Sequence, residues 1–230
     1  MRPYVFVNVA TSADGKLSTR ERRQVKISGT NDFSRVDRLK AGSDAIMVGI
    51  GTVLADDPSL TVKSPDLKAK REGKGMDEHP VRVVVDSRLR IPSDASVLHK
   101  GEGKRIIACA ACADAGRHME LEKMATIVEC GEAEVDLTCL LEKLYGMGIR
   151  RLMVEGGGTL IWSLISAGLV DQLTCFVGNI IIGGKEAPTL ADGTGFTRES
   201  EFVRLELAGL ERMDDGVVLT WNVLTGPLSG

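Results

Sequence analysis

Short apolar runs alternate with segments of helical periodicity through most of the chain. The runs are typical of buried strands and lie at Tyr4–Ala10, Asp44–Ile50, Val81–Asp86, Arg105–Ala110, Thr126–Cys130 and Arg151–Val154. Apolar residues at helical spacing fall between several of them, at 30–41, Asp114–Met124, Asp136–Tyr145 and Thr159–Ala167. Because parallel strands are joined by crossover helices, this order predicts an α/β fold with a largely parallel sheet.

The C-terminal part follows a different pattern. Leu173–Val177, Phe202–Leu210 and Gly216–Val223 have strand character with no helical pattern between them. We therefore expect antiparallel strands at one edge of the sheet. With 230 residues, 43% of them hydrophobic, the chain can bury one sizeable core, and we expect residues 1–230 to form one domain.

Two local segments carry further expectations. Thr30 or Asn31 is expected to cap the first helix, with Phe33, Val36 and Leu39 on one face. Residues Ser64–His79 are polar, mixed in charge and without clear periodicity, which predicts an exposed surface loop.

Charge and hydropathy exclude several classes of protein. The net charge is −3 and no block of basic residues occurs, so no nucleic-acid partner is expected. The charge-free stretches Gly156–Val170 and Gln172–Gly184 are too short and glycine-rich to span a membrane. The first residues lack the features of a signal peptide. We expect a soluble cytoplasmic protein with no membrane partner.

The cysteine pattern predicts reduced thiols. There are five cysteines, an odd number, which argues against a disulfide framework. Cys109 and Cys112 have the spacing of a redox or zinc motif, but the remaining cysteines and the histidines add no further ligands at suitable spacing. We interpret the pair as buried structural thiols and predict no metal site.

The run Val154-Glu-Gly-Gly-Gly-Thr159 joins a predicted strand to a predicted helix. A glycine-rich turn that opens a helix leaves free N–H groups for a phosphate and lets it approach the backbone closely. The alternative is a tight turn that needs a positive φ, with the Glu155 carboxylate capping the helix. The run is neither the dinucleotide fingerprint G-x-G-x-x-G nor a P-loop.

A second candidate motif is Met47–Leu60, where a strand ends in Gly49 and Gly51 and a short helix stops before Pro58. Thr52 and Asp56 lie on one face of that helix, one turn apart. A threonine there can bind phosphate or ribose, whereas an aspartate favours ribose or amide groups. The alternative is that the two aspartates before the proline only terminate the helix.

A third motif, Val83-Val-Val-Asp-Ser-Arg88, ends a strand in Ser87 and Arg88. Serine and arginine at a strand's carboxyl end can hold the 2′-phosphate that distinguishes NADPH from NADH. Ligands of open α/β sheets bind outside the carboxyl ends of the strands, where all three motifs are expected. Together they predict a dinucleotide site.

With these motifs in place, the chain resembles the reductases of riboflavin biosynthesis that act on 2,5-diamino-6-(ribosylamino)-4(3H)-pyrimidinone 5′-phosphate. These enzymes are related to the C-terminal domain of the bifunctional deaminase–reductase. The resemblance covers nearly the whole chain and rests on five motifs in order, Asp14–Leu17, Gly51–Val62, Val81–Ser87, Glu155–Thr159 and Gly183–Pro188.

The resemblance implies a dihydrofolate-reductase-like fold: a mostly parallel sheet flanked by helices, with antiparallel C-terminal strands. It also implies NADPH as hydride donor and a homodimer. Site residues follow by motif match. The expected cofactor contacts are Thr52, Asp56, Ser87, Arg88, Gly156, Gly157, Gly158 and Thr159. The expected substrate contacts are Lys40, Leu60, Lys63 and Glu155, with Lys40 and Lys63 near the ribose phosphate.

Two positions depart from the bacterial bifunctional pattern. Asn8 stands where those enzymes have a lysine near the sugar carbon, and asparagine cannot act as a general acid. Lys40 stands where they have an arginine, and it can hold a phosphate only as a point charge. We keep Asn8 and Glu155 as the candidate catalytic residues. The zinc deaminase signature is absent, which fits the archaeal and fungal order in which reduction precedes deamination.

The expected reaction is NADPH-dependent reduction of the ribosylamino side chain to the ribitylamino form. A reductase of another heterocycle, either the deaminated uracil form or a pterin, is the first alternative. A non-catalytic nucleotide-binding regulator is the second. A pterin lacks the phosphate for which Lys40 and Lys63 are suited, and a regulator would consume no NADPH.

Overall fold

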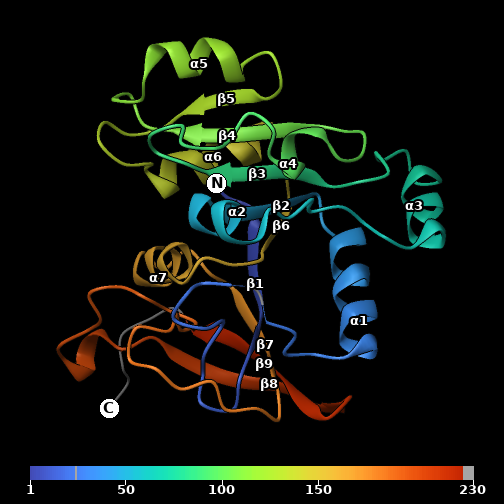
Figure 1. Cartoon of the computed structure of the whole chain (residues 1–230), viewed down its shortest axis with the longest axis vertical. Helices are drawn as coiled ribbons and strands as arrows, with labels where there is room; N and C mark the ends of the chain where they lie inside the picture. Colours follow the sequence, from blue (N-terminus) through green and yellow to red (C-terminus); the bar gives the residue numbers. More distant parts are fainter. Residues whose placement is uncertain (24, 225–230) are drawn as a thin grey trace.

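The computed structural model describes residues 1–23 and 25–224 of the chain and contains one nine-stranded sheet. Figure 1 shows this sheet running the length of the molecule, from β5 at one end to β8 at the other. The strands are β1 (Tyr4–Thr11), β2 (Ala45–Gly49), β3 (Val81–Val85), β4 (Arg105–Cys109), β5 (Thr126–Glu129), β6 (Arg151–Val154), β7 (Gln172–Val177), β8 (Arg204–Met213) and β9 (Gly216–Leu224).

The strand order is β5-β4-β3-β2-β6-β1-β7-β9-β8. All pairs among β1 to β7 are parallel. Strand β9 runs antiparallel to β7 and to β8. The expected fold class, a mostly parallel sheet with antiparallel C-terminal strands, is confirmed.

Helices cover both faces of the sheet and enclose two apolar cores. The helices are α1 (Thr30–Ala41), α2 (Ile50–Asp56), α3 (Pro65–Glu72), α4 (Ser96–His99), α5 (Ala115–Leu121), α6 (Leu137–Gly146) and α7 (Gly158–Ser166), with a 3₁₀ turn at Glu199–Glu201. One core contains side chains of α6 and α7, and the other contains side chains of α1, α2, α4 and α5. The alternation of side chains along each buried strand supplies both cores.

Helix α1 begins where the sequence predicts but is capped differently. Its N-cap residue, Gly29, has no capping side chain, and neither Thr30 nor Asn31 caps it. The carboxylate of Asp214, in the β8–β9 turn, instead accepts hydrogen bonds from the backbone N–H groups of Asn31 and Asp32. The side chain of Phe33 is 54% exposed, so the expected apolar face does not include it.

The segment Ser64–His79 is not simply a loop, because it contains α3. Ser64 caps this helix by accepting a hydrogen bond from the Leu67 N–H at 3.4 Å. Arg71 is buried and donates to the carbonyl oxygens of Ala41 and Ser43. The segment lacks an apolar stripe because this arginine, rather than an aliphatic side chain, anchors it. Within residues 1–23 and 25–224, no helix is both long and apolar enough to cross a membrane.

Candidate active site

A cavity of about 1200 Å³ lies at the carboxyl ends of β1, β2, β3 and β6. The three sequence motifs meet here, since its walls include Thr52, Ser87 and the turn Glu155–Thr159. Side chains from β1, α2 and α7 complete these walls. The sequence therefore predicted correctly that separate strand ends converge on one cavity. The cavity is large enough for a dinucleotide together with part of a second molecule.

Gly156 and Gly157 form the turn that leads into α7. Gly156 and Gly157 have φ angles of 141° and 90°, which side-chain-bearing residues rarely adopt. A Cβ atom at Gly156 or Gly157 would lie 3.4 or 3.5 Å from Thr52 Oγ1, so both glycines face α2 across the cavity mouth. Gly157 is the N-cap of α7 and leaves its first N–H groups without a side-chain acceptor. This is the geometry of an anion site at a helix N-terminus.

Gly158 is required for packing. A Cβ atom at this position would lie 2.5 Å from the carbonyl oxygen of Thr189 and 2.8 Å from Asp192 Oδ2. The Asp192 N–H also donates to the Gly158 carbonyl at 3.0 Å. Gly158 thus lets the 189–192 turn close against α7, while Thr159 is exposed and lines the cavity.

The two aspartates after α2 have separate roles. Asp56 lines the cavity next to Thr52, and partial burial raises the pKa of its carboxyl. Asp57 has a left-handed φ of 42°, and its carboxylate accepts hydrogen bonds from the Ser96 N–H and hydroxyl, both at 2.6 Å. The helix-terminating chemistry therefore belongs to Asp57, and Asp56 is free to meet a ligand.

Strand β3 brings Ser87 to the cavity but not Arg88. Ser87 lines the wall and its hydroxyl accepts a hydrogen bond from the Val135 N–H at 3.1 Å. Arg88 is exposed and does not line the cavity, whereas Arg90 does. The Arg90 Nε lies 3.7 Å from the carboxylate of Asp86, which is fully buried. Sequence reasoning missed Arg90 because the turn after β3 reverses side-chain direction at Leu89, where φ is 53°.

Glu155 stands at the cavity wall and pairs with a lysine of α1. Its carboxylate lies 3.0 Å from Lys40 Nζ, and both side chains are largely shielded from solvent. The Glu155 N–H donates to the Met47 carbonyl, which fixes the residue against β2. The carboxylate is therefore held by a cation rather than by the N–H groups of α7.

The remaining expected site residues lie outside the cavity lining. Leu60 is buried at 3% exposure, and Lys63 is an exposed residue whose Nζ donates to Ser59 and Thr61. Asn8 is 6% exposed, and its Oδ1 is without a hydrogen-bond partner among the described residues. The cavity wall thus contains Glu155 but not Asn8.

Loop residues complete the cavity and were not predicted from the sequence. They come from the segment before α1, from the turn before α6 and from the loop after β7, and are Ser18, Arg22, Val25, Lys26, Ile27, Ser28, Glu134, Val135, Asp136 and Pro188. These loops lack a periodic or glycine-rich pattern, so only the fold brings them to the strand ends.

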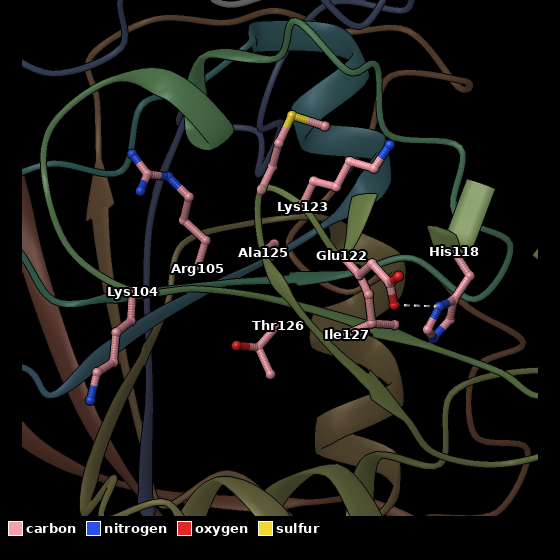
Figure 2. A pocket seen from close by; sticks show the side chains of 9 residues that line it. Lys104, Arg105, His118, Glu122, Lys123, Ala125, Thr126 and Ile127 are labelled. Carbon is pink, nitrogen blue, oxygen red and sulfur yellow. Dashed lines mark ion pairs between the residues drawn. The ribbon is translucent and has the colours of Figure 1, made fainter. Parts of the chain in front are cut away.

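A second, smaller hollow of about 380 Å³ lies at the β5 edge of the sheet. Figure 2 shows its basic lining, with Lys104, Arg105 and Lys123 around it and a dashed contact from His118 to Glu122. That contact joins Nδ1 and Oε2 at 3.6 Å. None of the expected site residues lies here, so this hollow is separate from the candidate active site.

The cysteines contribute no site. Cys109 is buried as expected, but Cys112 is exposed, so only the first of this pair is a core thiol. Burial raises the pKa of the Cys109 thiol. Among residues 1–23 and 25–224, no group of histidine, cysteine or acidic side chains is arranged to hold a metal ion.

Comparison with known proteins agrees with this geometry. The model of the RibD C-terminal domain family matches residues 3–219. A 2,5-diamino-6-ribosylamino-4(3H)-pyrimidinone 5′-phosphate reductase from Archaeoglobus fulgidus is 52% identical over 209 residues, which is 91% of this chain and 95% of that protein. A reductase of the same name from Methanothermobacter thermautotrophicus is 43% identical, over 97% of this chain and 99% of that protein.

A solved structure extends the agreement to three dimensions. The RibD protein of Acinetobacter baumannii superimposes with a TM-score of 0.80 at 25% identity, covering 97% of this chain and 58% of that one. The family match spans all the strands except the end of β9 and every element that lines the cavity. The chain therefore belongs to the RibD C-terminal domain family.

Proposed function

We propose that this protein uses NADPH to reduce the ribosylamino side chain of 2,5-diamino-6-(ribosylamino)-4(3H)-pyrimidinone 5′-phosphate to the ribitylamino form. The observation that supports this most directly is the meeting of Thr52, Ser87 and the Gly156–Gly157 turn in one cavity beside the carboxylate of Glu155. The names of the two archaeal relatives support the choice of substrate.

The cavity residues fit a dinucleotide. The free N–H groups at the start of α7 suit the pyrophosphate, and the two positive-φ glycines keep side chains away from it. Thr52 and Asp56 suit the ribose hydroxyls across the cavity mouth. When bound, NADPH supplies the hydride, and the protein supplies orientation and exclusion of water.

The substrate is reduced in its open-chain imine form. Saturating its carbon–nitrogen double bond would need a hydride at C1′ of the sugar, which bound NADPH would supply, and one proton at the nitrogen. Glu155 and Lys40 form an ion pair at the cavity wall and are the groups best suited to hold the sugar hydroxyls and to guide a proton-donating water. Asn8 is buried, does not line the cavity and would act as a hydrogen-bonding residue only.

The cofactor preference is assigned to Ser87 and Arg90 instead of Ser87 and Arg88. Arg90 lines the same cavity as Ser87 and its side chain is 58% exposed, which suits the 2′-phosphate of NADPH. The test is the ratio of kcat/KM for NADPH and NADH in Arg90→Met, with Arg88→Met as the matched control. Arg90→Met should lose most of the preference and Arg88→Met should keep it; the opposite result would reinstate Arg88.

One assay tests the reaction itself. NADPH oxidation is followed with the diaminopyrimidinone phosphate and with the deaminated uracil phosphate in parallel. Faster turnover of the diamino compound supports the proposal. Preference for the uracil compound would place the enzyme after deamination, and no oxidation with either would favour a nucleotide-binding regulator.

We also propose that the protein is a homodimer and that it works in the cytoplasm. The edge hairpin leaves Leu205, Leu207 and Leu210 exposed by 42%, 56% and 65%, on the face that continues the α7-side core. A second copy covering this apolar face would remove it from water. Leu207→Glu should then yield monomers in sedimentation or light scattering, whereas a wild-type protein that is already monomeric would contradict the dimer.

The free thiols are compatible with a reducing compartment such as the cytoplasm.

A further inference from the structure

The turn between β8 and β9 contacts helix α1, although the two are far apart in the sequence. Strand β9 pairs antiparallel with β7, with Val217 opposite Val177, so this turn lies at the carboxyl end of the parallel strands. Figure 1 shows the tip of the hairpin, in red, beside the end of α1 at which the helix begins. The turn is therefore at the same end of the sheet as the cavity.

The carboxylate of Asp214 makes this contact. Its Oδ1 accepts hydrogen bonds from the backbone N–H and the side-chain amide of Asn31, at 3.2 and 2.9 Å, and its Oδ2 accepts one from the Asp32 N–H at 3.0 Å. The helix dipole also favours a negative charge here. A Cβ atom at Gly29 would lie 2.5 Å from Asp214 Cγ, so the carboxylate comes this close only because Gly29 has no side chain.

The cavity wall on either side of this contact has few other polar supports. Ile27, Ser28 and Phe33 all line the cavity. Among the described residues, no backbone–backbone hydrogen bond involves Ile27 or Ser28. Ile27 packs against the end of β7, where a Cβ atom at Gly178 would lie 2.8 Å from its Cγ2. The Asp214 carboxylate is thus the main polar anchor of this part of the wall.

The other end of α1 is anchored independently. The buried Arg71 donates to the carbonyl oxygen of Ala41, the last residue of the helix, at 2.8 Å. Lys40 pairs with Glu155 at 3.0 Å. Loss of the Asp214 contact should therefore loosen the first turn of α1 without moving Glu155.

We propose that Asp214 is a positioning residue for substrate binding, which holds the first turn of α1 and thereby fixes residues 27–33 in the cavity wall. This assignment rests on the proposed function, in which the substrate occupies the side of the cavity near Glu155 and α1. Without the carboxylate, substrate binding has to order this part of the wall, and that costs conformational entropy. Removing Asp214 should weaken substrate binding and leave the chemical step unchanged.

Steady-state kinetics with Asp214→Gly test this role. Glycine removes the carboxylate and adopts the left-handed φ of 49° without strain. The KM for the pyrimidine substrate should rise about tenfold, while kcat and the Kd for NADPH stay within about twofold. A merely structural role would lower the amount of active enzyme, and hence kcat, at unchanged KM.

Two further variants of the same turn serve as controls. Asp214→Asn keeps one acceptor oxygen and tolerates the left-handed conformation, so it should recover most of the substrate affinity. Asp215→Asn removes the charge of the neighbouring exposed carboxylate and should keep the wild-type KM. A rise in KM in Asp215→Asn equal to that in Asp214→Gly would overturn the assignment.

Gly29→Ala tests the same contact from the side of the helix. The φ of Gly29 is −101°, which suits alanine, so the new methyl should act by displacing the Asp214 carboxylate. This variant should raise the KM as Asp214→Gly does. In the double variant the methyl has no carboxylate to displace, so the KM should be no higher than in Asp214→Gly. Additive effects would show that the two residues act separately.

Hydrogen exchange measured by mass spectrometry tests the contact without turnover. In Asp214→Gly the amides of residues 27–33 should exchange faster, whereas those of residues 37–41 should exchange as in the wild type. Unchanged exchange in residues 27–33, or faster exchange there with an unchanged KM, would overturn the assignment. A wild type that reduces neither pyrimidine would refute the proposed function and the substrate role with it, and the exchange rates would still decide whether Asp214 holds the wall.

Discussion

Replacing Gly157 by alanine tests whether the turn before α7 is open for a phosphate. Its φ of 90° and ψ of 95° lie outside the regions that residues with a side chain commonly adopt, so a side chain adds about 1–3 kcal/mol of backbone strain. The loss of flexibility in the unfolded chain offsets about 0.4–1 kcal/mol of this. The free energy of unfolding should therefore fall by about 1 kcal/mol, or roughly 2–4 °C in Tm for a chain of this size.

The loss of NADPH affinity in Gly157→Ala should be larger than the backbone strain alone would cause. The new methyl would lie 3.5 Å from Thr52 Oγ1 and 3.6 Å from Leu160 Cβ, so it fits among the neighbouring protein atoms without a clash. It would occupy the space into which a pyrophosphate must come to reach the N–H groups of α7. We expect the Kd for NADPH to rise more than tenfold, a change of about 1.4 kcal/mol or more. Calorimetric titration and urea unfolding measure the two quantities separately.

Gly148 provides a matched control at the other end of β6. Its φ is 93°, and a Cβ atom there would meet nothing within 4 Å. Gly148→Ala should therefore lose the same stability as Gly157→Ala and bind NADPH normally. If the two variants bind NADPH equally well, the glycines before α7 only form a tight turn and the anion-site reasoning is refuted.

Three further predictions concern single side chains. Thr52→Ala should weaken NADPH binding by about 1 kcal/mol, and Asp56→Ala should weaken it by roughly 1.5–3 kcal/mol when the carboxylate is charged. Neither substitution should change the stability of the protein. An unchanged Kd for NADPH in both variants would show that α2 does not contact the cofactor. Glu155→Gln should lower kcat strongly at near-normal NADPH affinity, and a parallel fall in Tm would instead indicate a structural role. Hydrogen bonds from Ser96 lower the pKa of Asp57, so its stabilisation is present above the ordinary carboxyl pKa and is lost as the pH falls through the lowered value. The Tm difference between wild type and Asp57→Asn should accordingly shrink on acidification, and a constant difference would contradict this.

The sheet could be predicted from the sequence because each strand carries its own local signal. Arg151–Val154 begins and ends at the predicted residues, and the other strands agree within a few residues. The order of the strands could not be predicted, since nothing local says that β6 lies between β2 and β1. The capping of α1 by Asp214 could not be predicted either, because Asp214 lies 183 positions from Asn31 in the sequence.

The candidate site was predictable where its residues lie at strand ends. Thr52, Ser87 and Glu155 follow strands and are found together in the cavity. The choice between Arg88 and Arg90 depended on the left-handed turn at Leu89, which no glycine marks in the sequence. The division between Asp56 and Asp57 depended on Ser96, a residue of helix α4 that lies 39 positions further along the chain.

The position of β1 in the sheet has a consequence for synthesis of the chain. Both neighbours of this strand, β6 and β7, belong to residues 151–177. The apolar strand at the N-terminus therefore emerges from the ribosome long before its partners do. Until residue 177 has emerged, Val5, Phe6 and Val7, which are almost fully buried in the finished protein, cannot pair on both sides. We expect the nascent β1 segment to be a binding site for chaperones that recognise exposed apolar segments.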